Sequence, residues 1–200
     1  MTDSAPRYAR LGWLFAAVWL FYLAENLSAL LARGNDWQRD VGLAALAGFA
    51  AGYLALIVVL RAVRHGDRPR GRGLTLRLWA ALLGLLALFA LQVPGAGHHA
   101  LTCLVYIAAA AMTGLPLPQA VPFTAALVAG SELASRLIPG WRDNGYGLAV
   151  LLAGLATYGI RLAGDRQSRL LAAREELATM AVHDERARIA ADLHDILGHS

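Results

Sequence analysis

The chain has 200 residues, of which 58% are hydrophobic and 16% are charged, and its formal net charge is +4. The charged fraction is well below the roughly 25% that soluble domains contain, so the composition excludes an ordinary soluble protein and favours a membrane protein. The basic residues, all of them arginine, flank apolar runs and form no patch of the kind that binds nucleic acid.

Six apolar runs have the length of about 20 residues that a helix needs to cross the hydrocarbon core. They cover residues 11–32, 41–60, 74–93, 99–115, 120–138 and 146–163. The connection at residues 115–119, Leu-Pro-Leu-Pro-Gln, carries no charge, so the fourth and fifth runs could instead form one re-entrant or strongly kinked element. A bundle of five spans is therefore the alternative to one of six.

The positions of the arginines predict the orientation, because short loops rich in Lys and Arg stay on the cytoplasmic side of a membrane. With six spans, one side receives Arg7, Arg10, Arg61, Arg64, Arg68, Arg70, Arg72, Arg77, Arg161, Arg166, Arg169 and Arg174. The other side receives Arg33, Arg39, Arg136 and Arg142. Both termini are therefore predicted to be cytoplasmic, whereas five spans would place either the Arg-rich second loop or the Arg-rich tail outside.

A few polar residues lie within the apolar runs, where charge is costly and usually serves a function. Glu25, beside Asn26, and Glu132 are predicted to lie at similar depth towards the outer leaflet. We hypothesise that they line a shared polar pocket that senses the stimulus, with Arg136, one turn after Glu132, as a partner. Separate structural hydrogen bonds, or an ion pair at the end of a span, are the alternative interpretation.

No metal site is predicted. Cys103 is the single cysteine and lies in an apolar run, which excludes an internal disulfide and any metal motif built on cysteines. His98 and His99 fall in a short outer loop and could bind a metal or respond to pH. Two adjacent histidines, however, cannot readily share one ion from a helix.

After residue 163 the sequence becomes charged and rich in alanine, and from Leu170 onward it contains no proline, which predicts a long helix. Leu170 and Leu177 are seven residues apart, and so are Val182, Ile189 and Ile196, as at the seam of a coiled coil. The two sets are out of phase, so the seam must shift between Leu177 and Val182. An amphipathic helix on the membrane surface is the alternative.

The last residues combine side chains that suit phosphoryl transfer. His194 lies one step off the predicted seam and is followed by Asp195, a carboxylate that could orient or deprotonate the imidazole. His199 is four residues after Asp195 and shares its helix face, so the two could position a water. On spacing alone, a solvated surface histidine remains the competing interpretation.

The final sixteen residues, ERARIAADLHDILGHS, resemble the dimerisation and phosphoacceptor motif of histidine kinases of HisKA subgroup three, the nitrate-sensor and desaturase-regulating kind. The resemblance implies that His194 accepts the γ-phosphoryl group of ATP and that Asp195 is the general base. It also implies that Asp195 and His199 correspond to the pair that dephosphorylates the partner. Many family members have glutamine at the position of His199 and arginine at that of Ala191.

The resulting prediction is an all-α protein, a polytopic membrane helix bundle followed by a long cytoplasmic coiled-coil and phosphoacceptor helix. The expected domains are a transmembrane sensor (1–163), a signalling helix (164–183) and the start of the dimerisation and phosphoacceptor domain (184–200). The resemblance implies a homodimer in the bacterial inner membrane that acts on a response regulator. The 200 residues contain no nucleotide cradle, so ATP and Mg²⁺ are expected to bind a separate kinase domain, without which the chain cannot phosphorylate itself.

Two other functions remain possible from the residues. One is a non-catalytic membrane regulator that dimerises with full-length histidine kinases. The other is a small transporter or channel, which is disfavoured because few acidic residues lie well inside the spans and no inverted repeat is visible.

Overall fold

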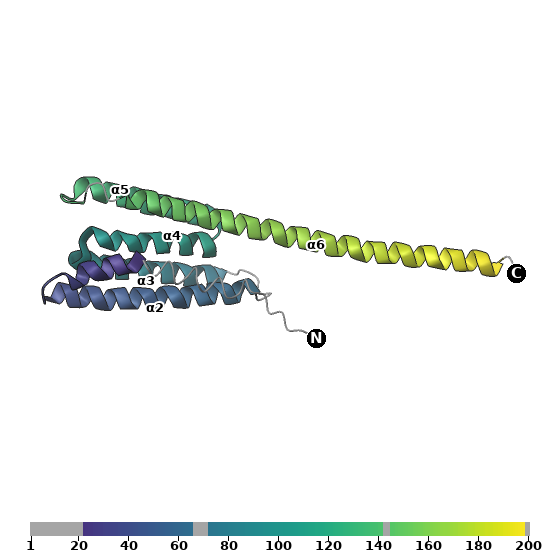
Figure 1. The fold of residues 1–200 in the computed structure, drawn as a ribbon, viewed down its shortest axis with the longest axis horizontal. Helices are drawn as coiled ribbons and strands as arrows, with labels where there is room; N and C mark the ends of the chain where they lie inside the picture. The colour runs from purple at the N-terminus through teal and green to yellow at the C-terminus, as the bar shows by residue number, and fades with distance from the viewer. Residues whose placement is uncertain (1–21, 66–71, 142–144, 199–200) are drawn as a thin grey trace. The chain divides into compact units, whose positions relative to one another are not determined.

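The computed structural model describes residues 22–65, 72–141 and 145–198, and every regular element in these ranges is a helix (Figure 1). The all-α prediction is therefore confirmed. The chain divides into two compact units, Met1–Thr157 and Tyr158–Ser200.

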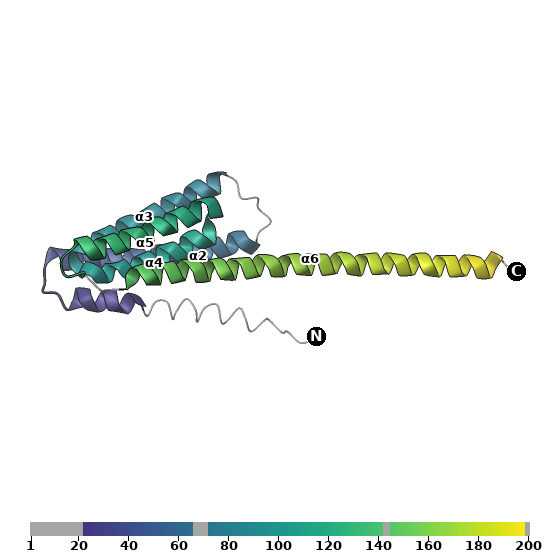
Figure 2. The same cartoon turned by 90° about the horizontal axis from the view of Figure 1, so that it is seen from above.

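The first unit contains most of the predicted spans. Its described part begins with a helix over residues 22–31, which belongs to the predicted span 11–32. The elements that follow are α2 (Trp37–His65), α3 (Arg72–Ala96), the 3-10 helix η1 (Gly97–Leu101), α4 (Thr102–Gly114), α5 (Leu117–Leu137) and the start of α6 (Tyr146–Gly198), as Figure 2 shows. The predicted apolar runs therefore coincide with helices over the described residues.

Helices α2 and α3 pack closely along their length because α2 has glycines on the contact face. Carbon atoms added at Gly48 and Gly52 would lie 3.4 Å from Leu88 and from Leu85 of α3, respectively. Two glycines four residues apart allow helix backbones to approach within a membrane. The later glycine on α2 faces the earlier leucine on α3, so the two helices are antiparallel.

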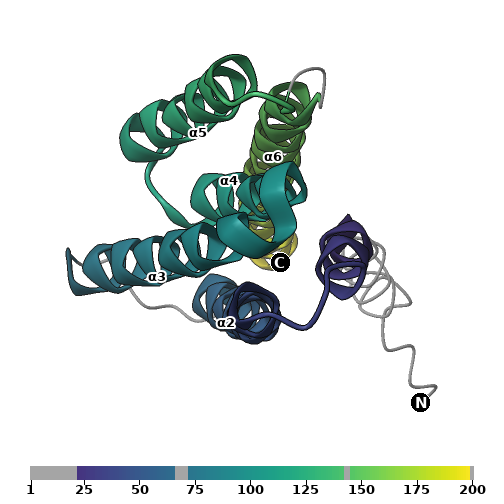
Figure 3. The same cartoon turned by 90° about the vertical axis from the view of Figure 1, so that its left-hand side faces the viewer.

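Helix α4 forms the core of the first unit. Its residues from Thr102 to Ala108 are all buried, and an Ala-rich helix that is apolar on every side is suited to that position. The fully buried ring of Tyr106 meets Phe49 and Tyr53 of α2 edge to face, with centroids 6.1 and 5.2 Å away. Figure 3 shows α4 lying among its neighbours α2, α3 and α5.

The connection between α4 and α5 is a tight reversal between two separate helices. Leu115 and Pro116 are both extended, with ψ of 156° and 142°, and this ends α4 because the residue before a proline disfavours the helical region. The reversal is held against the start of α3, where Trp79 Nε1 donates a hydrogen bond of 3.0 Å to Gln119 Oε1. The proline-rich sequence therefore separates two helices and does not kink a single one.

The outer surface of the helices is apolar. Exposed side chains include Leu54 and Val58 on α2, Leu83 on α3, and Leu148 and Leu152 on α6. In the described residues, three segments are long and apolar enough to cross a membrane, namely Trp37–Val63, Gly73–Gly114 and Tyr146–Ala181. Such helices are stable in a bilayer because their backbone N–H and C=O groups form hydrogen bonds within the helix.

The second unit is the rest of α6, which is helical from Tyr158 to Gly198. The prediction of an uninterrupted helix beyond Leu170 is confirmed. Leu170, Leu177 and Met180 are between 52% and 65% exposed, so this helix carries large apolar side chains that no other part of the described chain covers.

Candidate functional site

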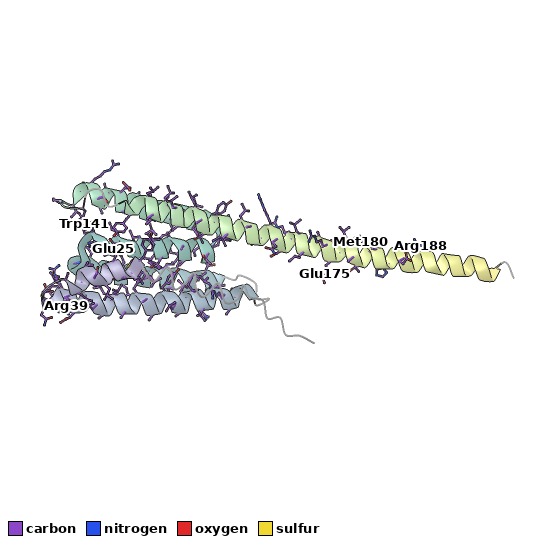
Figure 4. The ribbon with its side chains drawn as sticks, in the orientation of Figure 1. Glu25, Arg39, Trp141, Glu175, Met180 and Arg188 are labelled. Atoms are coloured by element: carbon purple, nitrogen blue, oxygen red, sulfur yellow. The ribbon has the colours of Figure 1, made fainter. Side chains whose placement is uncertain are left out.

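Polar side chains gather at the end of the first unit where α3 ends and α6 begins. Glu25 and Trp141 lie at this end in Figure 4. The helix over residues 22–31, η1, α4 and α6 all contribute to it, and Asn26 and Gln92 extend it into the buried core. This end is the candidate sensing site.

Asn26, Gln92 and Cys103 form a fully buried polar cluster. The Asn26 amide Nδ2 donates to Gln92 Oε1 at 2.6 Å and lies 3.7 Å from Cys103 Sγ. The Cys103 thiol donates to the same Gln92 oxygen at 3.5 Å, and Gln92 Nε2 donates to the Leu88 carbonyl at 3.1 Å. The cluster therefore joins the helix at residues 22–31 to α3 and α4 through directional contacts, although Asn26 Oδ1 has no hydrogen-bond partner among the described residues.

We expect Asn26→Leu and Gln92→Met each to lower the free energy of unfolding by about 1.5 kcal/mol, because each leaves a buried amide group without its partner. The double variant should lose less than the sum of the two, since it leaves neither amide without its partner and only the weak Cys103 thiol donor loses its acceptor. Unfolding in detergent micelles, followed by circular dichroism, measures all three values. Strictly additive losses would show that the 2.6 Å contact contributes no coupling.

Glu25 is shared by several elements. Its Oε1 lies 3.4 Å from His99 Nδ1, and its carboxylate lies near the Tyr146 hydroxyl, on the first residue of α6. The Tyr146 hydroxyl also lies near Thr102 of α4, whose hydroxyl donates to the His99 carbonyl at 2.7 Å. The Glu25 and His99 side chains are 50% and 31% exposed. The pair is therefore half-buried where it approaches the start of α6.

Glu132 lies against the first turn of α6, next to the contact that Glu25 makes. A carbon atom added at Gly147 would be 2.0 Å from Glu132 Oε1, so glycine is needed at Gly147 for the carboxylate to occupy this position. A carboxylate near a helix N-terminus is stabilised by the helix dipole. The two glutamates that the sequence singled out therefore lie near neighbouring residues of α6.

The predicted partnership of Glu132 with Arg136 is a separate matter. No ion pair joins these two residues among the described side chains, and Glu132 and Arg136 are both exposed.

The loop before α2 is tied to the end of α3 by Arg33. Its guanidinium donates to the carbonyls of Pro94 and Gly95 at 2.9 and 3.2 Å, and also to Asp36 and Gln38. Asp36 caps α2 by accepting the Arg39 backbone N–H at 2.8 Å. This hydrogen bond, together with Arg33, holds the pKa of the Asp36 carboxyl below its ordinary value.

The predicted phosphoacceptor residues lie at the other end of α6. The backbone is helical through His194 and Asp195 and up to Gly198, whereas His199 lies outside the described residues. Arg188 pairs with Glu185 at 2.8 Å, with the two side chains 70% and 50% exposed. Such exposed pairs on a helix surface contribute little stability, so Arg188 has the surroundings of a solvated helix charge.

Sequence reasoning missed the roles of Gln92 and Tyr146, and it used Cys103 only to exclude a disulfide and a metal motif built on cysteines. The signal for Gln92 was present, because an amide inside an apolar run must find a partner. Tyr146 gave no signal, because a tyrosine at the end of a span is common at a membrane interface. In the described ranges, no group of three His, Cys, Asp or Glu side chains is arranged to hold a metal ion.

Comparisons of the chain with protein-family models, with curated proteins and with solved structures found no match.

Proposed function

We propose that this chain is the membrane sensor and phosphoacceptor part of a two-component histidine kinase. The observation that supports the proposal is that α6 is one uninterrupted helix containing both a stretch apolar enough to span a membrane, within Tyr146–Ala181, and the His194 and Asp195 of the motif. A rigid helix can carry a rotation or a shift from one of its ends to the other. A change in packing around Tyr146 would in this way alter how His194 is presented.

We propose six membrane spans with both termini in the cytoplasm of a bacterium. The arginines support this orientation, since Arg61 and Arg77 lie where α2 ends and α3 begins, at the same end as the reversal beside Trp79. The segment Gly73–Gly114 contains both α3 and α4, and the predicted span 11–32 and α5 supply the crossings beyond the three long apolar segments. Helix α4 is short for a span, but η1 precedes it directly and lengthens it.

A homodimer through α6 is the assembly that we propose. Leu170, Leu177 and Met180 have the spacing of seven and then three residues found at a coiled-coil seam, and all three are more than half exposed in the single chain. Burying such side chains against a second copy removes apolar surface from water. The shift of seam predicted between Leu177 and Val182 is where two alternative packings would differ.

The resemblance of the motif implies the chemistry. A bond forms between an imidazole nitrogen of His194 and the γ-phosphorus of ATP, the bond to the leaving ADP breaks, and Asp195 takes the imidazole proton. Positioning and charge neutralisation at the phosphate require Mg²⁺ and a nucleotide site, which a separate kinase domain would supply. The phosphoryl group would then pass to an acidic residue of a response regulator.

The test is to join the chain, after Ser200, to the second dimerisation helix and ATP-binding domain of a subgroup-three kinase and to reconstitute the fusion in nanodiscs. We expect label from γ-³²P-ATP that is stable in base and lost in acid, as a phosphohistidine is. The 200 residues without the added domain should take up no label. An unlabelled fusion, when the donor kinase itself is active, would contradict the proposal.

A further inference from the structure

Two oppositely charged side chains lie on an exposed face of α5. Val121, Ala125, Ala129, Glu132 and Arg136 follow one another at intervals of three or four residues, so they share one side of the helix, and all five are exposed. We call these five residues the outer face. Neither Glu132 nor Arg136 forms an ion pair with another residue that the structure describes.

The opposite face of α5 packs inside the first unit. Its buried residues are Ala120, Thr124, Leu127, Ser131 and Ser135, which also recur at intervals of three or four. Figure 3 shows α5 at the margin of the helix bundle, with α4 beside it. The rotation of α5 is therefore fixed by its buried side, and the outer face points away from the helices that it packs against.

Lipid is a poor neighbour for the outer face. In the proposed topology α5 crosses the membrane, although it is not one of the three described segments that are apolar enough to cross by composition. Charged side chains within a span are costly and usually pair or face other protein. Arg136 lies in the last turn of α5, and its long side chain can reach the membrane surface. Glu132 lies one turn deeper and is shorter, so lipid alone leaves its carboxylate without a countercharge.

A second copy of the chain supplies that countercharge. A two-fold axis brings the same surface of both copies together, so the base of one copy lies near the acid of the other. Side chains on a helix lean towards its N-terminus, which directs Arg136 to the level of Glu132. The four residues between them correspond to about 6 Å along the axis, a length that an extended arginine side chain spans. Small Ala125 and Ala129 allow two such helices to approach closely.

We propose that the outer face of α5 is a contact between two copies of the chain within the membrane, in which Arg136 of each copy pairs with Glu132 of the other. An acid and a base one turn apart complement a copy of themselves, whereas a different protein would need the same two charges in register. This contact is distinct from the one proposed for the cytoplasmic part of α6. It rests on the proposed function only through the crossing of α5.

The first measurement is disulfide formation between copies that carry Ala129→Cys, reconstituted in vesicles at a high ratio of lipid to protein. We expect a cross-linked dimer, because Ala129 lies in the middle of the outer face. Leu54→Cys, on the exposed side of α2, is the matched control and should not cross-link. Buried Cys103 stays in place, and the chain without an added cysteine gives the background. No cross-link at Ala129, or an equal one at Leu54, would overturn the proposal.

Reversing the charges tests the pairing itself. Glu132→Arg and Arg136→Glu, each added to Ala129→Cys, should lower cross-linking at least about tenfold, because like charges then face each other. The two variants mixed in the same vesicles should cross-link again, since each copy carries the charge that the other lacks. The chain with both reversals should also recover, and recovery shows that the variants fold. A single variant that cross-links normally, or a mixture that does not recover, would contradict the pairing.

Two further readouts separate this contact from the proposed function. If a membrane-impermeant maleimide labels Ala129→Cys in sealed vesicles, α5 does not cross, and the six-span topology and the contact both fail. A kinase fusion that forms phosphohistidine normally, while Ala129→Cys does not cross-link, would count against the contact alone. An unlabelled fusion in which this cross-link still forms would count against the proposed kinase function alone.

Discussion

Replacing His194 with glutamine is expected to abolish phosphoryl labelling of the kinase fusion, a loss of at least about 100-fold, because the side chain that forms the bond to phosphorus is gone. Asp195→Asn should slow labelling by about 100-fold, the lower end of what a general base contributes. It should leave the site of labelling unchanged. Mass spectrometry of the labelled peptide, under conditions that preserve phosphohistidine, locates the group.

Two further histidines on or near this helix make the test specific. His183 is exposed and lies eleven positions before His194, so His183→Gln is a matched control that should label at the normal rate. His199→Gln should also label normally and should retain the dephosphorylation of a phosphorylated response regulator, since glutamine is common there in the family that the motif resembles. His199→Ala should lose that second activity. Label found on His183 or His199 would contradict the role assigned to His194.

The second prediction concerns Gly95 on α3. Gly95→Ala is expected to lower the free energy of unfolding by about 2 to 3 kcal/mol, because an added carbon would lie 2.8 Å from the Gln38 backbone carbonyl oxygen and 2.8 Å from Leu30. The Gln38 carbonyl oxygen belongs to the backbone, so it cannot move away by a rotamer change as a side-chain atom can. The Gly95 carbonyl also accepts a hydrogen bond from Arg33, so a shift of α3 also disturbs the connection between the loop before α2 and the end of α3.

Gly84, on the same helix, provides the control. An added carbon there meets nothing within 4 Å, so Gly84→Ala should be neutral or should stabilise the protein by up to about 1 kcal/mol through its helix propensity. Thermal unfolding of both variants in one detergent, followed by circular dichroism, makes the comparison. Equal effects of the two substitutions would show that the close approach at Gly95 is not maintained in the folded protein.

Much of the local structure could be predicted without coordinates. The apolar runs at residues 41–60 and 74–93 lie within α2 and α3, because a chain in hydrocarbon must satisfy its backbone groups internally and a helix does so within one segment. The long helix beyond Leu170 followed from good helix formers without a proline. The reversal at Leu115 and Pro116, by contrast, was ambiguous, since the same prolines are compatible with a kink or with a turn.

The candidate sensing site could be predicted only in part. Glu25 and Glu132 were noticed because charge inside an apolar run is costly, but no local pattern indicated that Glu132 lies against Gly147 in the first turn of α6. Asn26 lies 66 residues from Gln92 and 77 from Cys103, and no local pattern shows that the three meet. Which polar groups pair depends on the rotation and depth of every helix around α4.

The sequence by itself determined that the chain is helical and rich in apolar segments, and where the histidine motif lies, because these properties depend on residues close together along the chain. Only the tertiary structure decided that Gly95 lies against the Gln38 backbone, whereas Gly84 has open space around it. It also decided that Tyr146 lies near Glu25. Both depend on how closely two helices approach, and that distance is set by all the side chains packed between them.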